Sequence, residues 1–142
     1  MATTVDDWTR SLIADMRAHG GRPSDASGWA AGKPFLILTS KGAKTGDERV
    51  AITTYHIDGG RWVIAASKSG ADVNPGWYYN LKAHPETTIE VDNEVIPVRA
   101  AEVTGAERDR LWNDHVAALP EFGEYPKKTS RVIPMFVLER AG

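Results

Sequence analysis

The sequence predicts a single domain of the mainly β, α+β class, built as an antiparallel barrel with short helices. Six apolar runs have the length and the alternation that are typical of strands. Tight turn signals join several of these runs, which favours antiparallel neighbours over a doubly wound sheet. The chain contains no internal repeat and no linker, so we expect one domain that spans residues 1–142.

Residues 1–33 are expected to form an N-terminal helix and a loop. Four apolar residues recur at helical spacing, and Asp6 or Asp7 before them offers an N-cap. The pair Gly20-Gly21 ends this helix, and the segment up to Pro34 is rich in Gly, Ser, Ala and Pro. The apolar stripe consists of Trp8, Leu12, Ile13 and Met16.

The central part of the chain reads as three strands joined by turns. The expected strands cover residues 35–39, 49–57 and 61–66. A glycine-bearing turn joins the first two, and Asp58-Gly59-Gly60 is a hairpin signal between the second and the third.

A short helix comes next. Asn74 is a natural N-cap, and Pro75 suits the first helical position because its missing N–H would have no partner there. His84-Pro85 ends the helix, since the residue before proline avoids the helical region. Residues 88–91 and 95–103 then alternate as a strand pair.

The C-terminal part is expected to hold one more helix and the last strand. Thr104 and Glu107 form a capping box, and the apolar stripe behind them ends at Leu119. A polar loop over residues 120–130 leads to a final strand at 132–139.

Composition excludes several classes of function. The formal net charge of -2 argues against a nucleic-acid binder. The chain has no cysteine, so it has no disulfide, thiolate metal site or thiol nucleophile, which fits a reducing cytoplasm. The acidic N-terminus does not resemble a signal peptide, and no apolar run approaches membrane-spanning length.

Two glycine-bearing turns carry the strongest functional signal. The first, K-G-A-K-T-G-D-E-R at residues 41–49, contains Lys41, Lys44 and Arg49, and the second, A-A-S-K-S-G at 65–70, contains Lys68. Free backbone amides beside a cation suit a phosphate or a carboxylate. Two such turns indicate a long, polyanionic cofactor, although three of the cations can equally be solvated charges on an exposed hairpin.

Other candidate groups have simpler interpretations. The four histidines show no metal-ligand spacing, and His115 on an apolar helix face is expected in the core. Ser67 lacks the surroundings of a nucleophile elbow and reads as a turn hydroxyl. Trp77, Tyr78 and Tyr79 fit either the core or a flat wall for an aromatic ring.

At these residues the chain resembles the deazaflavin-dependent nitroreductases. The resemblance covers residues 34–139 and rests on T-S-K-G-A-K-T-G-x-x-R at 39–49, A-A-S-K-S-G-A at 65–71 and N-P-G-W-Y-Y-N-L-x-A-x-P at 74–85. It implies a split β-barrel of the FMN-binding-like type and the cofactor coenzyme F420, an 8-hydroxy-5-deazaflavin. The cofactor contacts that it implies are Lys41, Lys44, Thr45, Gly46, Arg49, Ile52, Ala65, Ala66, Ser67, Lys68, Pro75, Trp77 and Asn80.

The chain departs from nitroimidazole-reducing relatives in the loop after the last helix. Several tyrosines there correspond to Leu119, Phe122 and Tyr125, so only Tyr125 keeps a hydroxyl in the expected acceptor pocket. Tyr125 is the candidate for orienting or protonating the acceptor, and Ser67 for bonding the ring or the acceptor oxygen. Ala43 stands where the family often has arginine, which suggests a looser hold on the anionic tail.

The expected chemistry is hydride transfer from the reduced deazaflavin to a small electron-poor acceptor: a quinone, an activated enone or a nitro compound. No metal is needed. A non-catalytic deazaflavin carrier and an FMN-binding barrel stay open as alternatives. We expect a cytoplasmic monomer or homodimer that binds no nucleic acid. The apolar stripe of the first helix is expected to pack in the core, and the alternatives are that it caps the pocket or makes peripheral contact with a membrane that carries a quinone.

Overall fold

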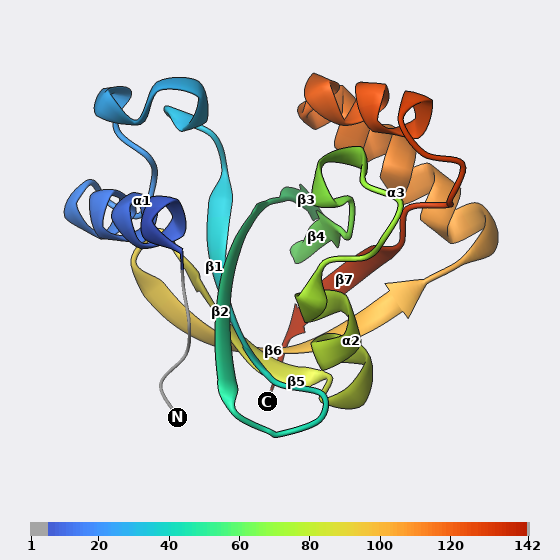
Figure 1. Cartoon of the computed structure of the whole chain (residues 1–142), viewed down its shortest axis with the longest axis horizontal. Coiled ribbons are helices and arrows are strands. Elements are labelled where there is room, and N and C mark those ends of the chain that lie inside the picture. The colour runs from blue at the N-terminus through green and yellow to red at the C-terminus, as the bar shows by residue number, and fades with distance from the viewer. Residues whose placement is uncertain (1–5, 142) are drawn as a thin grey trace.

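In the computed structural model, which describes residues 6–141, seven strands form one strongly curved antiparallel sheet (Figure 1). The order of the strands in the sheet is β2-β1-β5-β6-β7-β4-β3. The strands are β1 (Phe35–Lys41), β2 (Glu48–Thr54), β3 (His56–Asp58), β4 (Arg61–Ala65), β5 (Glu86–Val91), β6 (Glu94–Val103) and β7 (Met135–Arg140).

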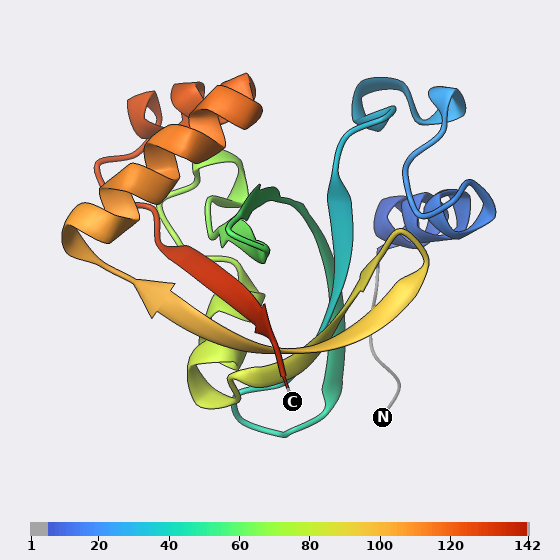
Figure 2. The ribbon, with the colours of Figure 1, turned by 180° about the vertical axis from the view of Figure 1, so that it is seen from behind.

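The long strand β6 joins the two arms of the sheet. Its first half pairs with β5 and its second half with β7, so it bends across the base of both arms (Figure 2). The outermost strands, β2 and β3, are consecutive in the chain and meet at Tyr55. The sheet therefore curls into a half-barrel whose two edges are connected by one residue.

That connection corrects the strand count expected from the sequence. Six strands were predicted, with one strand over residues 49–57. The structure divides this segment at Tyr55, because β2 pairs with β1 whereas β3 pairs with β4. The Tyr55 N–H donates to the Pro34 carbonyl, and its ring is buried. The hairpin turn at Gly59 and Gly60 is confirmed, since both residues have the positive φ that such a turn requires.

Three α-helices and three short 3₁₀ helices lie along this sheet within the described residues. They are α1 (Asp7–Ala18), α2 (Gly76–Ala83), α3 (Gly105–Ala118), η1 (Asp25–Ala30), η2 (Lys68–Gly70) and η3 (Pro120–Lys127). The Asp6 side chain accepts from the Thr9 N–H and caps α1, as predicted. The predicted cap Asn74 is wrong: Pro75 occupies the N-cap of α2, and the Asn74 amide oxygen accepts from Arg131 instead.

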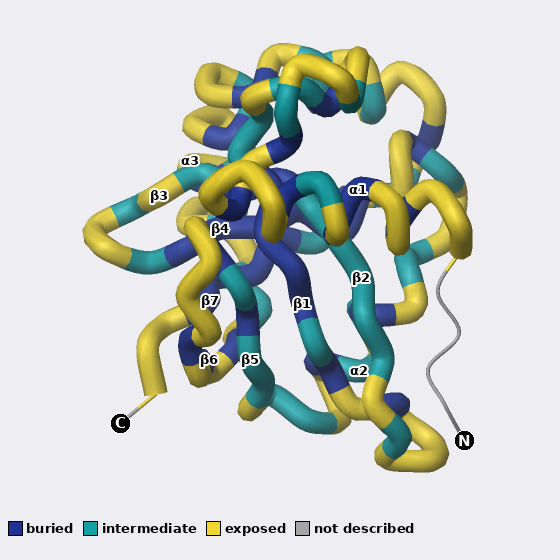
Figure 3. The backbone as a smooth tube through the Cα atoms, turned by 90° about the vertical axis from the view of Figure 1, so that its left-hand side faces the viewer, coloured by how far each residue is buried: buried dark blue, intermediate teal, exposed yellow. Residues whose placement is uncertain are grey.

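Burial on both faces of the sheet explains the continuous apolar runs of the central strands (Figure 3). Along β1, Leu36 and Leu38 point into the barrel core, while Phe35 and Ile37 pack against α1. Strand β4 alternates in the same way, and its outer side chains pack under α3 and η3. Helix α1 is thereby fixed to one arm of the half-barrel, and helices α3 and η3 to the other.

Candidate active site

A cavity of about 630 Å³ lies between the arms of the half-barrel. Its wall comes from β1, β2, the start of α1, η1, the end of β4, the turn after β4, α2 and η3. It contains most of the residues that the sequence analysis assigned to cofactor and acceptor. Those on the wall are Arg49, Ile52, Ala65, Ser67, Lys68, Pro75, Trp77, Asn80, Phe122 and Tyr125.

The remaining predicted residues lie off this wall. Ala66 and Leu119 are buried in two different core clusters. Lys41 and Gly46 line a neighbouring surface hollow along β1 and β5. Lys44 and Thr45 are exposed in the first glycine turn.

The first glycine turn is an exposed hairpin end that carries charge. The Gly42 N–H donates to the Asp47 carbonyl, and the Gly46 N–H donates to the Gly42 carbonyl. The Arg49 side chain remains 42% exposed and lies 4.0 Å from Asp47. Asn80 on α2 joins this turn to the cavity, because its amide oxygen accepts from the Ala43 N–H and its amide nitrogen donates to the Ser40 hydroxyl.

The second turn is held in an unusual backbone conformation at the cavity wall. Lys68, Ser69 and Gly70 have φ values of 46°, 55° and 84°. Two non-glycine residues in the left-handed region cost of order 1–3 kcal/mol each and persist only where the surroundings enforce them. The conformation places Ser67, Lys68 and Ser69 on the wall.

Helix η3 closes the cavity beside this turn. The Tyr125 ring packs against Phe122, with 5.0 Å between ring centroids. Burial raises the pKa of the Tyr125 hydroxyl, while a hydrogen bond with the Ser69 side chain lowers it in part. A tyrosine hydroxyl is protonated at neutral pH even at its ordinary pKa of about 10, so this group is able to donate a hydrogen bond into the cavity.

Two tryptophans at the mouth were not assigned to the site by the sequence, except that helix α1 was considered as a cap. Trp8 and Trp29 line the cavity and remain 57% and 62% exposed. Lys33 lies 5.2 Å from the centre of the Trp29 ring and pairs with Glu121 of η3 at 3.0 Å. This ion pair links the N-terminal segment to η3, although 88 residues separate its partners.

The face of β2 along the cavity was also largely missed. Residues 49–54 all line the wall, whereas only Arg49 and Ile52 were predicted. The sequence predicted a strand here, but it did not reveal that β2 lies at the edge of the sheet. That edge position is what allows the whole length of β2 to line the cavity.

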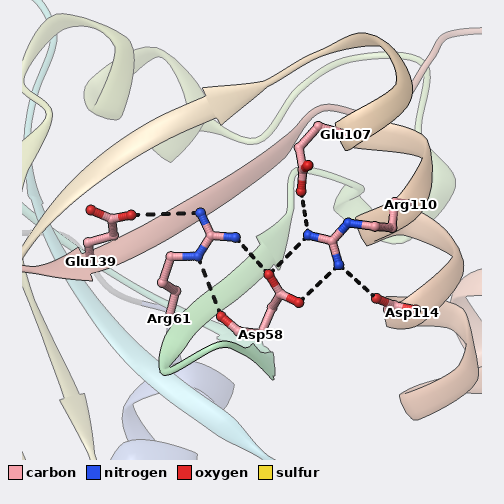
Figure 4. A network of polar contacts seen from close by, with 6 residues as sticks. All are labelled: Asp58, Arg61, Glu107, Arg110, Asp114 and Glu139. Carbon is pink, nitrogen blue, oxygen red and sulfur yellow. Dashed lines mark hydrogen bonds and ion pairs between the residues drawn. The ribbon is translucent and has the colours of Figure 1, made fainter.

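Helix α3 is fixed over β3 and β4 by a charge network at Asp58 (Figure 4). The carboxylate of Asp58 accepts hydrogen bonds from Arg61 and Arg110. Arg110 also pairs with Glu107 and Asp114 on its own helix. Hydrogen bonds from Arg110, then from Arg61, hold the pKa of Asp58 well below its usual range.

Between this helix and β3, the buried His115 of α3 meets the half-buried His56 of β3. The Nδ1 atoms of His56 and His115 are 2.7 Å apart, so one ring donates to the other. Neither Nε2 atom has a partner among the described residues. Burial, then repulsion from His56, lowers the pKa of His115 to about 3. The His115 ring packs edge-on against Phe122, which places the pair directly behind the cavity wall.

The donor set suits an anionic, planar cofactor. Two cations, several hydroxyls and the Asn80 amide line the cavity, and Trp77 adds an aromatic surface to the same wall. No group of three or more potential metal ligands occurs among residues 6–141. No helix in this described range is long and apolar enough to cross a membrane.

A half-open antiparallel barrel with this cavity has the architecture of the split-barrel, deazaflavin-dependent reductases. Within that class, the chain belongs to the F420H(2)-dependent quinone reductase family, whose sequence pattern matches residues 8–140. It is therefore an F420H2-dependent reductase with coenzyme F420 as its cofactor. The predicted family type, cofactor and reaction class are confirmed. The family that matches is named for quinone reduction, whereas the sequence analysis named the related nitroreductases.

Individual relatives agree in sequence and in structure. The chain is 41% identical over 112 residues to the F420H(2)-dependent quinone reductase Rv1261c of Mycobacterium tuberculosis, which covers 75% of this chain and 74% of the relative. The solved structure of the F420-H2-dependent reductase FDR-A is 36% identical, covers 75% of this chain and 94% of its own, and has a TM-score of 0.69. A structure described as a domain-swapped dimer is 32% identical, covers 94% and 98%, and has a TM-score of 0.71. The split barrel predicted from the sequence is thereby confirmed.

Proposed function

We propose that the protein transfers a hydride from reduced F420 to a quinone that enters between Trp8, Trp29 and Tyr125. The carrying observation is that one cavity wall combines two kinds of group. Two cations, Arg49 and Lys68, and several hydroxyl groups line it together with aromatic rings. The cations suit the anionic chain of the cofactor, and the aromatic rings suit a flat, apolar acceptor.

We assign residue roles on the same basis. Lys68 and Arg49 bind anionic groups, with Lys41, Lys44, Thr45 and Gly46 of the exposed turn extending that surface outward. Ile52, Ala65, Ser67, Pro75, Trp77 and Asn80 surround the ring and the chain that joins it to the phosphate. Ala66 and Leu119 support the wall from the core, and Phe122 and Tyr125 contact the acceptor.

The bound deazaflavin supplies the hydride, and the protein supplies position, exclusion of water and a proton. A quinone that accepts a hydride needs one proton to become a hydroquinone. The Tyr125 hydroxyl, which lies on the cavity wall, is the proton donor that we assign to the acceptor oxygen. Ser67 is buried at the wall and is assigned a hydrogen bond to the ring or to the acceptor.

Absorbance of F420 during reoxidation of F420H2 tests the acceptor class. We expect menadione to be reduced faster than cyclohexenone or a nitroaromatic compound at equal concentration. Binding of F420H2 without turnover on any of the three would favour the carrier alternative. Fluorescence quenching by F420 and by FMN provides a second arm, and tighter binding of FMN would favour the FMN alternative.

Assembly and location belong to the same proposal. A homodimer is supported by the relative described as domain-swapped, and light scattering after gel filtration distinguishes it from a monomer. We place the protein in the cytoplasm, where it would reach a quinone at the membrane surface. Co-sedimentation with lipid vesicles measures whether it binds that surface. Trp8 is the residue to substitute in that assay, because Leu12, Ile13 and Met16 are buried.

A further inference from the structure

Arg131 lies outside the cavity wall but bonds to the segment that forms it. Its guanidinium donates four hydrogen bonds, all to residues 66–74. The acceptors are the carbonyl oxygens of Ala66 at 3.0 Å, Ser67 at 2.9 Å and Ala71 at 2.8 Å, and the amide oxygen of Asn74 at 2.7 Å. These acceptors lie on both sides of the left-handed residues.

This position accounts for the persistence of the strained turn. A turn with three successive positive φ values would relax if its ends were free. Arg131 fixes both ends to one planar group, whose geometry does not adapt as a flexible ammonium does. On the opposite side, Gly70 packs against Lys128 and Tyr125 of the η3 segment.

We infer that Arg131 is a positioning residue, which holds the turn of residues 66–71 in the conformation that presents Ser67, Lys68 and Ser69 to the cofactor. The inference rests on the proposed function, because it concerns the same site. It assigns to a residue outside the cavity wall a share of the cofactor affinity. Its mechanism is geometric, since all four acceptors are uncharged groups.

Arg108 provides a matched control. It also bonds to the backbone of the C-terminal segment, donating twice to the Ile133 carbonyl, and it does not line the cavity. Its loss should affect packing near α3 without changing the turn. Comparison of Arg131→Ala with Arg108→Ala therefore separates positioning from general support of the fold.

Two measurements test the inference. In the cofactor-free protein, Arg131→Ala should speed amide hydrogen exchange in the 66–74 segment by at least 10-fold, whereas Arg108→Ala should leave it within 2-fold. In fluorescence titration with F420, Arg131→Ala should weaken binding by about 10- to 100-fold, as for loss of a set of hydrogen bonds to one group, and added guanidinium at millimolar concentration should restore part of it.

Arg131→Lys keeps the positive charge but loses the planar guanidinium group, so it separates a geometric role from an electrostatic one. It also replaces Arg131→Ala in these tests if the alanine variant does not fold. We expect it to bind F420 nearly as weakly as the alanine variant. Wild-type affinity and exchange in Arg131→Lys would overturn the inference. If wild-type protein itself fails to bind F420, the proposed function fails, whereas normal binding by both Arg131 variants defeats only the positioning role.

Discussion

The two glycine turns beside the cavity resemble each other in sequence and differ in what holds them. The first, residues 41–49, is mostly exposed, and the Asn80 side chain ties it to α2. The second, residues 66–71, is fixed by Arg131 on one side and packs against η3 on the other. The first turn can contribute charge that salt screens, whereas the second contributes geometry that substitutions disturb.

Substitution of one glycine in each turn should give the largest contrast. Gly70 has a φ of 84°, and an added Cβ would lie 3.0 Å from the Lys128 side chain and 3.3 Å from the Tyr125 Cα. Gly46 has a φ of 74° and nothing within 4 Å of an added Cβ. We expect Gly70→Ala to lower the free energy of unfolding by about 2–3 kcal/mol, and Gly46→Ala by about 1 kcal/mol.

Chemical denaturation measures both values, and F420 titration shows whether the strain reaches the cofactor site. The affinity should fall with Gly70→Ala and change little with Gly46→Ala. Equal losses of stability in the two variants would mean that the second turn is not confined by its neighbours.

The role of Tyr125, which lies on η3 beside the second turn, is tested by Tyr125→Phe. If the hydroxyl protonates or orients the quinone, turnover should fall by about 10- to 100-fold, which is at or below the low end of general acid catalysis because water can partly replace it. Tyr79→Phe is the matched control, since Tyr79 is 53% exposed and does not line the cavity. A lower steady-state rate with menadione in Tyr125→Phe, at unchanged F420 affinity, would support the role. An unchanged rate would mean that Tyr125 is only part of the cavity wall.

The histidine pair that packs behind η3, His56 and His115, should make the stability of the protein depend on pH. The first turn contains no histidine and should not contribute to this dependence. The folded-state pKa of His115 is lowered to about 3, and that of His56 is also lowered by burial, although Asp114 and Asp58 raise it in part and Arg110 lowers it. Unfolding frees both rings to take up protons below pH 6.5. Stability is therefore complete above pH 6.5 and is lost as the pH falls, by up to about 1.4 kcal/mol per pH unit for each ring.

Denaturation curves between pH 7.5 and 4.5 measure this slope. His115→Leu should remove much of it and lower stability at pH 7.5, while His19→Gln should leave the slope unchanged, since His19 is exposed. A slope that survives in His115→Leu would assign acid sensitivity to other groups.

The smallest effect is expected at the cations of the first turn. Lys44→Ala or Arg49→Ala should weaken F420 binding by about 1 kcal/mol at low salt, because exposed charges interact through water. The loss should shrink in 0.5 M salt. Titrations at two salt concentrations check this, with Lys82→Ala on α2 as the control. A salt-independent loss would show that the first turn is buried by the bound cofactor.

Local signals predicted most elements because they act within a few residues. Asp6 at the start of α1 and Gly59-Gly60 in the β3–β4 hairpin have the roles expected from the sequence. One error occurred where a distant partner intervened, and another where a neighbouring residue on the same helix competed. Asn74 has the composition of a helix cap, yet its side chain bonds to Arg131, 57 residues away. Thr104 is the N-cap of α3, but its side chain makes no capping bond and Glu107 pairs with Arg110.

The sequence by itself determined the family, most of the strands and helices, and the two cation-bearing turns, because each is encoded in a short run of residues. Only the tertiary structure decided which cations line the cavity, that Trp29 and β2 complete its wall, and that His56 meets His115. It also decided that Arg131 bonds to the segment of the second turn, through four hydrogen bonds that join residues 57 to 65 positions apart. Contacts at that separation depend on how the sheet curls, which no local pattern specifies.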